Sequence, residues 1–318
     1  MDTLLTGLRA AGEPTRLRLL ALCAHGELTV TELTQILGQS QPRVSRHLKL
    51  LCDGGFLDRI REGSWVFYRL SDDGACAHLG RTLVDLIPEG DPVLALDLKR
   101  LETVKQARAE RAASYFRANA ARWNEIRSLY VSETDVEKAL LALVGDDRVD
   151  DYLDIGTGSG RLLELLAPKV RRGTGIDLSK EMLSVARANL ESAALRHCQV
   201  RQGDMYNLSL PNDSADLVTL HQVLHYADNP SAAITEACRV LKPGGRLIVV
   251  DFAPHELEFL REEHAHRRLG FADEDIAEWC RQAGLELADV RHLEGDPLTV
   301  SIWPAYKTTT TDTGEWLQ

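Results

Sequence analysis

A glycine-rich segment preceded by an acidic residue is the part of the sequence best suited to bind a polar ligand. Gly156, Gly158 and Gly160 alternate with other residues, and Asp154 comes just before them. Apolar residues before the glycines predict a strand, and residues 161–167 predict a helix. A glycine turn between a strand and a helix lets the backbone approach a ligand at the positive helix N-terminus. We therefore expect these residues to form a ligand-binding loop.

The spacing of the glycines bears on the kind of ligand. A dinucleotide loop follows the pattern Gly-x-Gly-x-x-Gly, whereas here Arg161 takes the last place and the third glycine comes one residue early. A second predicted strand ends in Asp177, about 20 residues after the loop, and a third ends in Asp204. An acid at the end of the second strand suits bidentate hydrogen bonding to two ribose hydroxyls.

These pieces, followed by strand-like residues 216–221 and 240–250, occur in an order that resembles the class I S-adenosylmethionine-dependent methyltransferases. The resemblance covers roughly residues 115–307. It implies an α/β fold with a seven-stranded Rossmann-like sheet that binds S-adenosylmethionine (SAM) or S-adenosylhomocysteine (SAH). It also implies that Asp204 binds the adenine amino group. The expected cofactor contacts are Asp154, Gly156, Gly158, Gly160, Asp177, Leu178, Asp204, Met205 and His221.

Methyl transfer is an in-line displacement in which alignment supplies much of the catalysis. A base is needed only if the nucleophile must lose a proton. The candidate catalytic residues are His221, His225 and Tyr226, near the predicted fourth strand. In the family that the sequence resembles, His221 more often borders the cofactor. The methyl acceptor is expected to be a small molecule that the sequence does not identify.

A second set of residues, near the N-terminus, is suited to DNA binding. Residues 29–38 and 40–51 predict two helices joined by a short turn, and the second helix carries basic residues three apart. This pattern is typical of a helix-turn-helix with a recognition helix. Residues 56–61 and 65–70 predict a hairpin that would act as a wing. The expected DNA contacts are Ser40, Gln41, Arg43, Ser45, Arg46, Lys49, Arg59 and Arg61.

Residues 13–71 resemble the ArsR family of winged-helix repressors. The resemblance implies a homodimer that reads a two-fold-symmetric operator in double-stranded DNA. Family members that sense arsenite carry two cysteines on the first helix of the motif, whereas this sequence has Thr29 and Thr31 there. Threonine does not replace a thiolate toward a soft metal, so we expect no metal site at this position.

Composition sets limits on both functions. The chain of 318 residues has a formal net charge of −11, which argues against general attraction to nucleic acid but allows a local basic face. No apolar run reaches membrane-spanning length and no signal peptide is evident, so we expect a cytoplasmic protein without a membrane partner. The six scattered cysteines are expected to be reduced thiols rather than a disulfide framework or a zinc site.

Helical patterns are expected over residues 75–86 and 93–127, and further on over 257–269 and 273–282, with a closing strand pair at 285–293 and 298–306. The expected parts are a winged helix-turn-helix domain (1–74), a helical dimerisation or linker segment (75–112), a SAM-binding methyltransferase domain (113–307) and a disordered tail (308–318).

Three functions remain open at this point. The chain could be a repressor whose C-terminal domain binds SAM or SAH and sets DNA affinity. It could be an active methyltransferase whose DNA-binding domain links expression to its substrate. It could also be a methyltransferase whose N-terminal domain only dimerises, although the basic helix argues against this third function.

Overall fold

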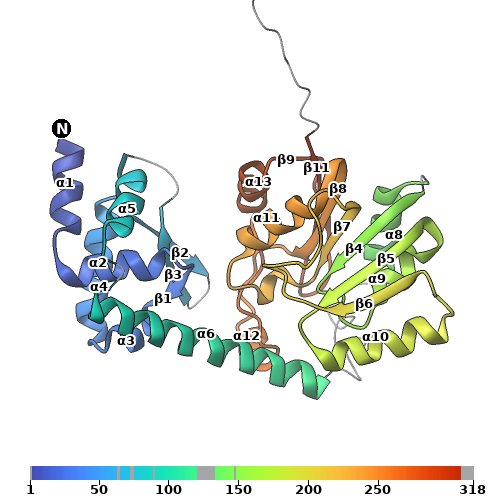
Figure 1. Cartoon of the computed structure of the whole chain (residues 1–318), viewed down its shortest axis with the longest axis horizontal. Helices are drawn as coiled ribbons and strands as arrows, with labels where there is room; N and C mark the ends of the chain where they lie inside the picture. Colours follow the sequence, from blue (N-terminus) through green and yellow to red (C-terminus); the bar gives the residue numbers. More distant parts are fainter. Residues whose placement is uncertain are drawn as a thin grey trace, which may run out of the picture. The chain divides into compact units, whose positions relative to one another are not determined.

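The computed structural model describes residues 2–62, 65–71, 75–88, 90–119, 133–146 and 148–308. The chain divides into two compact units, Met1–Arg111 and Ala112–Gln318. The elements of the first unit are α1 (Asp2–Ala11), α2 (Pro14–Cys23), β1 (Leu28–Thr29), α3 (Val30–Leu37), α4 (Gln41–Asp53), β2 (Leu57–Glu62), β3 (Trp65–Leu70), α5 (Ala75–Asp85) and most of α6 (Pro92–Asn119) (Figure 1).

The helix-turn-helix of the first unit is confirmed as α3 and α4. Thr29 caps α3 through a reciprocal pair of hydrogen bonds with Glu32, in which each residue's backbone N–H donates to the other's side chain. Gly38 ends α3 in a left-handed conformation with φ of 64°. On α4, Val44 and Leu48 are fully buried in the core of the unit. The capping and apolar signals of the sequence therefore fix both helices locally.

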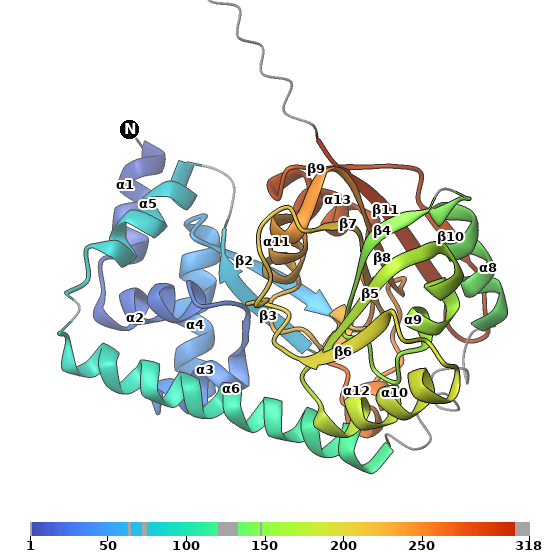
Figure 2. The same cartoon turned by 45° about the vertical axis from the view of Figure 1, so that its right-hand side comes forward.

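The predicted hairpin is also confirmed. β2 and β3 pair antiparallel from Leu57↔Leu70 to Glu62↔Trp65, and β1 adds to the other edge of β3. Figure 2 shows the two long strands of the hairpin side by side. The predicted turn at residues 63–64 lies outside the described residues.

The first part of α6 packs on the core of the first unit. Leu101 and Val104 are buried in the core of this unit. Asp97 is fully buried and accepts two hydrogen bonds from Arg18, at 2.5 and 2.8 Å. The predicted continuation of this helix from residue 120 to 127 lies outside the described residues, as does most of the predicted tail.

A mostly parallel sheet organises the second unit (Figure 1). Its strand order is β10-β11-β8-β7-β4-β5-β6, with β9 also paired to β11; β4 to β8 run parallel, and β9, β10 and β11 are antiparallel. The elements are α8 (Glu133–Val144), β4 (Val149–Ile155), α9 (Arg161–Leu166), β5 (Val170–Asp177), α10 (Lys180–Ser192), β6 (Cys198–Gln202), β7 (Ala215–His221), α11 (Pro230–Val240), β8 (Leu241–Phe252), α12 (Phe259–Glu263), α13 (Asp273–Gln282), β9 (Leu285–Leu287), β10 (Arg291–Leu293) and β11 (Val300–Lys307).

The helices cover both faces of this sheet. One core joins alternate strand residues such as Val218 and Val249 to α11 and α13. The other core joins the intervening residues, such as Leu217 and Val250, to α8, α9 and α10. Apolar strand residues that pack on both sides are typical of a doubly covered parallel sheet.

The closing strands differ from the sequence prediction. The strand expected over residues 285–293 is divided into β9 and β10, so that the sheet has eight strands instead of seven. The division lies opposite Pro304 of β11, whose carbonyl accepts a hydrogen bond from the Ala288 N–H at 2.8 Å. Proline has no N–H to donate in return, so the ladder is interrupted there.

The helix expected over residues 257–269 was wrong beyond its first part. Only Phe259–Glu263 is helical, and Ala265 adopts a left-handed conformation with φ of 57°. The backbone N–H groups of Arg267 and Arg268 then donate to the His225 carbonyl instead of continuing a helix. The segment from His264 onward is therefore a loop fastened to the end of the sheet.

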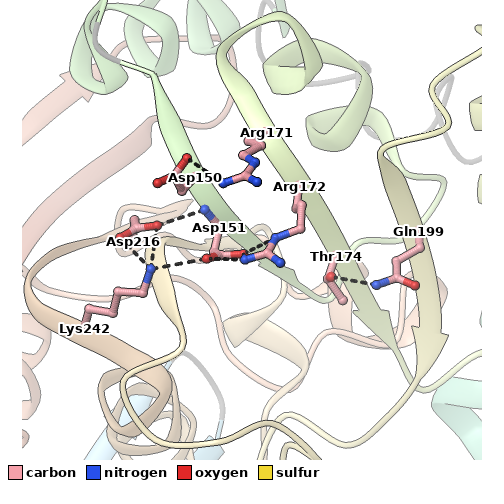
Figure 3. Close-up of polar contacts among 8 residues, drawn as sticks. All are labelled: Asp150, Asp151, Arg171, Arg172, Thr174, Gln199, Asp216 and Lys242. Atoms are coloured by element: carbon pink, nitrogen blue, oxygen red, sulfur yellow. Dashed lines mark hydrogen bonds and ion pairs between the residues drawn. The ribbon is translucent and has the colours of Figure 1, made fainter.

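Ion pairs join the first residues of the parallel strands, at the edge opposite their carboxyl ends (Figure 3). Lys242 Nζ lies 2.9 Å from Asp216 Oδ1 and 3.2 Å from Asp151 Oδ2. Arg172 binds the same Asp151 carboxylate at 2.7 Å. Hydrogen bonding to Asp216 raises the pKa of Lys242. This network connects β4, β5, β7 and β8 near their first residues. A ligand site is therefore expected at the other edge of the sheet, at the carboxyl ends of the strands.

Candidate cofactor and methyl-transfer site

The glycine loop connects β4 to α9 at the carboxyl edge of the sheet. Gly156, Gly158 and Gly160 have φ values of 75°, 53° and 81°. These angles disfavour residues with side chains, and a Cβ at Gly156 would also collide with Val223. The loop backbone is held by the Ile176 carbonyl, which accepts hydrogen bonds from the N–H groups of residues 156 and 157 at 2.8 and 3.0 Å. The loop is thus built from glycine for both conformation and space.

Asp177, at the end of β5, ties the loop to the neighbouring strand. Its Oδ2 accepts a hydrogen bond from the Gly158 N–H, and its Oδ1 accepts one from the Ser179 N–H, both at 2.8 Å. Burial raises the pKa of Asp177, and these backbone hydrogen bonds oppose the shift. The carboxylate is therefore positioned by the backbone on both sides of it.

Asp154, at the end of β4, is held inside the fold. It is only 2% exposed, and its Oδ1 accepts a hydrogen bond from the Thr219 hydroxyl at 2.6 Å. The Tyr152 hydroxyl lies 2.7 Å from the same threonine oxygen. Since the single threonine proton goes to Asp154, Tyr152 is the donor of this second hydrogen bond. The chain of three side chains orients the Asp154 carboxylate beneath the loop.

A pocket lies at the carboxyl ends of β4, β5 and β7, where the strand order reverses direction and ligands bind in such sheets. Its lining residues are Phe116, Asp154, Gly156, Thr157, Gly158, Leu162, Asp177, Met182, His221, Gln222, Val223 and Tyr226. Six predicted site residues line this pocket, and they come from sequence segments up to 72 positions apart. The parallel strands bring these segments together at one edge of the sheet.

 The predicted residues that line the pocket are Asp154, Gly156, Gly158, Asp177, His221 and Tyr226.

The other predicted cofactor residues surround the pocket without lining it. Gly160 caps α9, and Leu178 follows β5 with 63% of its surface exposed. Asp204 follows β6 and accepts a hydrogen bond from the Tyr206 N–H at 3.0 Å. Met205 is half-buried and packs on a core of the sheet. Their roles toward the adenine therefore remain a proposal.

The pocket also contains residues that sequence reasoning missed. The Thr157 hydroxyl is buried and has no hydrogen-bond partner among the described residues. Gln222 follows β7 with a φ of 50°, a strained conformation for a residue with a side chain. An unpaired hydroxyl and a glycine cradle both fit a polar ligand such as SAM. No spacing signal in the sequence distinguishes these two residues from ordinary turn residues.

His225 lies next to the pocket and forms a buried pair with Asp251 of β8. Its Nδ1 is 2.7 Å from Asp251 Oδ1, and its backbone N–H donates to Oδ2 at 3.2 Å. Both residues are almost fully buried. The His225 ring lies 4.1 Å, between centroids, from the ring of the pocket residue Tyr226. Among the described residues, His225 Nε2 forms no hydrogen bond, so it is the nitrogen left to accept a proton.

Aromatic rings extend from the pocket toward this pair. Phe116, near the end of α6, meets Tyr226 edge-on with ring centroids 4.9 Å apart. The Tyr115 hydroxyl lies 2.8 Å from His264 Nδ1. Burial raises the pKa of Tyr226 well above its usual value, so its hydroxyl stays protonated. The side of the pocket next to His225 is therefore lined by the aromatic rings of Phe116 and Tyr226, and the Tyr226 hydroxyl can donate a hydrogen bond there.

The predicted DNA-binding residues lie on the surface of the first unit. On α4 and its cap, Ser45 is half-buried, and the exposed residues are Ser40, Gln41, Arg43, Arg46 and Lys49. Arg59 and Arg61 are exposed on β2. The basic side chains thus face away from the core that Val44 and Leu48 enter.

In the part of the chain that the structure describes, no group of three or more histidine, cysteine or acidic side chains could hold a metal ion. No described helix is long and apolar enough to cross a membrane. All six cysteines are free in the structure, and burial raises the pKa of Cys280 to about 12.

Family models match both parts of the chain. The model described as "Methyltransferase domain" matches residues 153–249, and the model described as "Bacterial regulatory protein, arsR family" matches residues 13–59. The ubiquinone biosynthesis O-methyltransferase of Pseudomonas aeruginosa is 31% identical over 204 residues, which cover 58% of this chain and 86% of that protein. The methyltransferase YcgJ of Bacillus subtilis is 34% identical over 105 residues, but these cover only 33% of this chain and 42% of that protein.

Solved structures share the fold of the second unit. A chain from the Haloferax volcanii complex between a methyltransferase activator and a methyltransferase has a TM-score of 0.53 at 23% identity, covering 61% of this chain and 98% of that chain. A geranyl diphosphate methyltransferase in complex with SAM has a TM-score of 0.51 at 14% identity, covering 55% of this chain and 86% of that chain. The chain therefore belongs to the SAM-dependent methyltransferases and carries an ArsR-family helix-turn-helix region near its N-terminus.

Proposed function

We propose that this protein is an ArsR-type transcriptional repressor whose second unit transfers a methyl group from SAM to an oxygen atom of a small molecule. The observation that carries the catalytic part is the buried His225–Asp251 pair beside a pocket built on the glycine loop. The name of the Pseudomonas relative, an O-methyltransferase, supports oxygen as the accepting atom. DNA as a partner supports a cytoplasmic location.

The proposed cofactor contacts follow the geometry of the loop. Asp177 would bind the two ribose hydroxyls, because its carboxylate is fixed at the end of β5 and borders the pocket. The unpaired Thr157 hydroxyl would bind a polar group of the same ligand. Leu178, Met205 and Asp204 would surround the adenine.

Bound SAM supplies an electrophilic methyl carbon, and the electrons of the broken carbon–sulfur bond stay on the sulfur atom. His225 Nε2 takes the proton of the acceptor hydroxyl as the oxygen bonds to this carbon. Asp251 keeps the proton on Nδ1, which leaves Nε2 as the base, and it stabilises the imidazolium that forms. Tyr226 remains protonated and can orient the acceptor by donating a hydrogen bond. His221 borders the pocket and would contact the cofactor.

The first unit supports DNA binding by a homodimer. Its exposed basic residues extend over the recognition helix and the hairpin. On α1, Leu4, Leu5 and Leu8 share one helix face and are each more than 40% exposed. An apolar helix face of this kind is suited to pairing with a second copy of the chain.

A second candidate function is control of DNA binding by SAM or SAH, with or without turnover. It is supported by α6, which contributes residues to both units. Arg100 donates a hydrogen bond to the Ile36 carbonyl of α3 at 3.0 Å, and Arg108 pairs with Glu32 at 3.1 Å. In the second unit, Phe116 of the same helix lines the pocket. A ligand can shift DNA affinity only if it binds the two states of the protein differently.

One experiment tests the proposed function and separates the two candidates. Isothermal titration with SAM and SAH measures cofactor binding, and a mobility-shift assay with DNA from upstream of the gene is repeated at saturating SAM and SAH. The proposal expects cofactor binding and a DNA shift. A shift whose midpoint is the same with and without cofactor would remove the second candidate, and absence of cofactor binding would refute the methyltransferase proposal.

A further inference from the structure

His266 is a buried histidine that the proposed mechanism does not use. The residue is 8% exposed, and its ring stacks on the His225 ring, with centroids 4.0 Å apart and an angle of 26°. It also meets the pocket residue Tyr226 edge-on at 5.3 Å. Its Nδ1 is buried and has no hydrogen-bond partner among the described residues. This nitrogen therefore loses its hydration in the fold without gaining a hydrogen bond.

Packing alone does not explain a histidine at this position. A phenylalanine would keep the stacking on His225 and on Phe252, whose ring lies 5.9 Å from His266, and would bury no unpaired polar atom. Unpaired buried polar groups are rare in folded proteins, and they occur at sites that bind a ligand or take part in catalysis. The nitrogen is thus better explained by a group that arrives with a ligand.

The surroundings of His266 restrict the chemistry of that group. Burial lowers the pKa of His266 well below its usual value, and the neighbouring His225 and His255 lower it further. The ring is therefore neutral and offers one hydrogen-bond donor and one acceptor. A neutral ring suits a hydroxyl or carbonyl group and gives no charge with which to bind a carboxylate or a phosphate.

We propose that His266 binds the methyl acceptor through a second oxygen, next to the hydroxyl from which His225 takes its proton. The two imidazole rings lie 4.0 Å apart between centroids, so two oxygens on neighbouring atoms of one ligand ring could each reach one of them. Phe116 and Tyr226 line the pocket with aromatic rings, which favour a flat ligand. The acceptor class is therefore a phenol with a second hydroxyl or a carbonyl in the adjacent position. This inference rests on the proposed function.

The test compares two probes, catechol and phenol, by isothermal titration into the full chain saturated with SAH. The variant His266→Phe keeps the ring but removes its nitrogens, and His266→Asn restores a polar atom. His292→Phe, at a histidine on β10 that bonds to Ser301 instead of lining the pocket, is the matched control. We expect the wild type and the control to bind catechol at least about tenfold more tightly than phenol, the factor that corresponds to 1.4 kcal/mol.

In His266→Phe we expect this preference to disappear through weaker catechol binding, with unchanged phenol and SAH affinities and no loss of thermal stability. His266→Asn should recover part of the preference. An unchanged preference in His266→Phe would overturn the proposal, and so would a wild type that binds SAH but neither probe; both results leave the methyltransferase proposal intact. A wild type that does not bind SAH would overturn both proposals.

Discussion

Replacing Asp177 by asparagine should weaken SAM binding strongly while leaving the second unit folded. The carboxylate accepts hydrogen bonds from the N–H groups of Gly158 and Ser179, each at 2.8 Å. Asparagine has nearly the same shape, but it keeps one acceptor oxygen and carries no charge. The variant can therefore hold one of these two backbone contacts, and it loses the charged acceptor that the ribose hydroxyls would use.

The expected magnitude follows from the two hydrogen bonds to ribose. A hydrogen bond to a charged group contributes about 1.5–3 kcal/mol. Loss of two such bonds corresponds to about 3–6 kcal/mol, and each 1.4 kcal/mol is a factor of ten in the dissociation constant. SAM affinity should therefore fall by roughly 100-fold to 10,000-fold.

Isothermal titration of wild type and Asp177→Asn with SAM measures this effect. Asp216→Asn is the matched control, because Asp216 lies at the opposite edge of the sheet and pairs with Lys242 (Figure 3). The control should bind SAM as the wild type does, even if its thermal stability falls. An Asp177→Asn variant that binds SAM within about threefold of wild type would refute the ribose assignment, since that ratio is below 1 kcal/mol.

Three further predictions concern DNA binding, catalysis and pH. Arg46→Ala should weaken operator binding in a mobility-shift assay by about 1–3 kcal/mol, because it removes an exposed cation from the recognition helix. His225→Gln should lower the methylation rate by roughly 100-fold to 10,000-fold, the usual contribution of a general base, with unchanged SAM affinity. Thermal unfolding should show stability falling as pH drops from 6.5, because burial lowers the pKa of His255 to about 4 and also holds that of His266 well below its usual value. The unfolded chain then binds protons that the folded unit excludes, at about 1.4 kcal/mol per pH unit for each histidine.

Each of these predictions has a control. Arg46→Lys keeps the charge and should retain most of the operator affinity. Asp251→Asn should lower the methylation rate as His225→Gln does, because the two side chains act as a pair. His266→Phe should make stability less dependent on pH between 6.5 and 5, and a profile as steep as that of wild type would contradict the assignment of the shift to this residue.

The elements that the sequence predicted well depend on local signals. Thr29 and Glu32 form the capping box that their spacing indicates, and Gly38 ends the same helix. The glycine loop has the left-handed angles that only glycine adopts easily. In each case the residues that determine the conformation lie within a few positions of one another.

The parts that could not be predicted depend on distant residues. Asp251 meets His225 only because β7 and β8 are neighbours in the sheet. The segment after α12 was predicted to continue a helix, but its N–H groups bind the His225 carbonyl, which lies about 40 residues earlier in the chain. Because Pro304 has no N–H, the strand that pairs with it is divided into β9 and β10, which lie more than ten residues earlier in the chain. None of these partners is visible from sequence spacing.

A crystal structure of the full chain grown with SAH tests the central claim most directly. The account predicts SAH in the pocket at the carboxyl ends of β4, β5 and β7, with its ribose hydroxyls on Asp177 and its sulfur atom toward Tyr226. SAH bound elsewhere, or an empty pocket at saturating SAH, would contradict it.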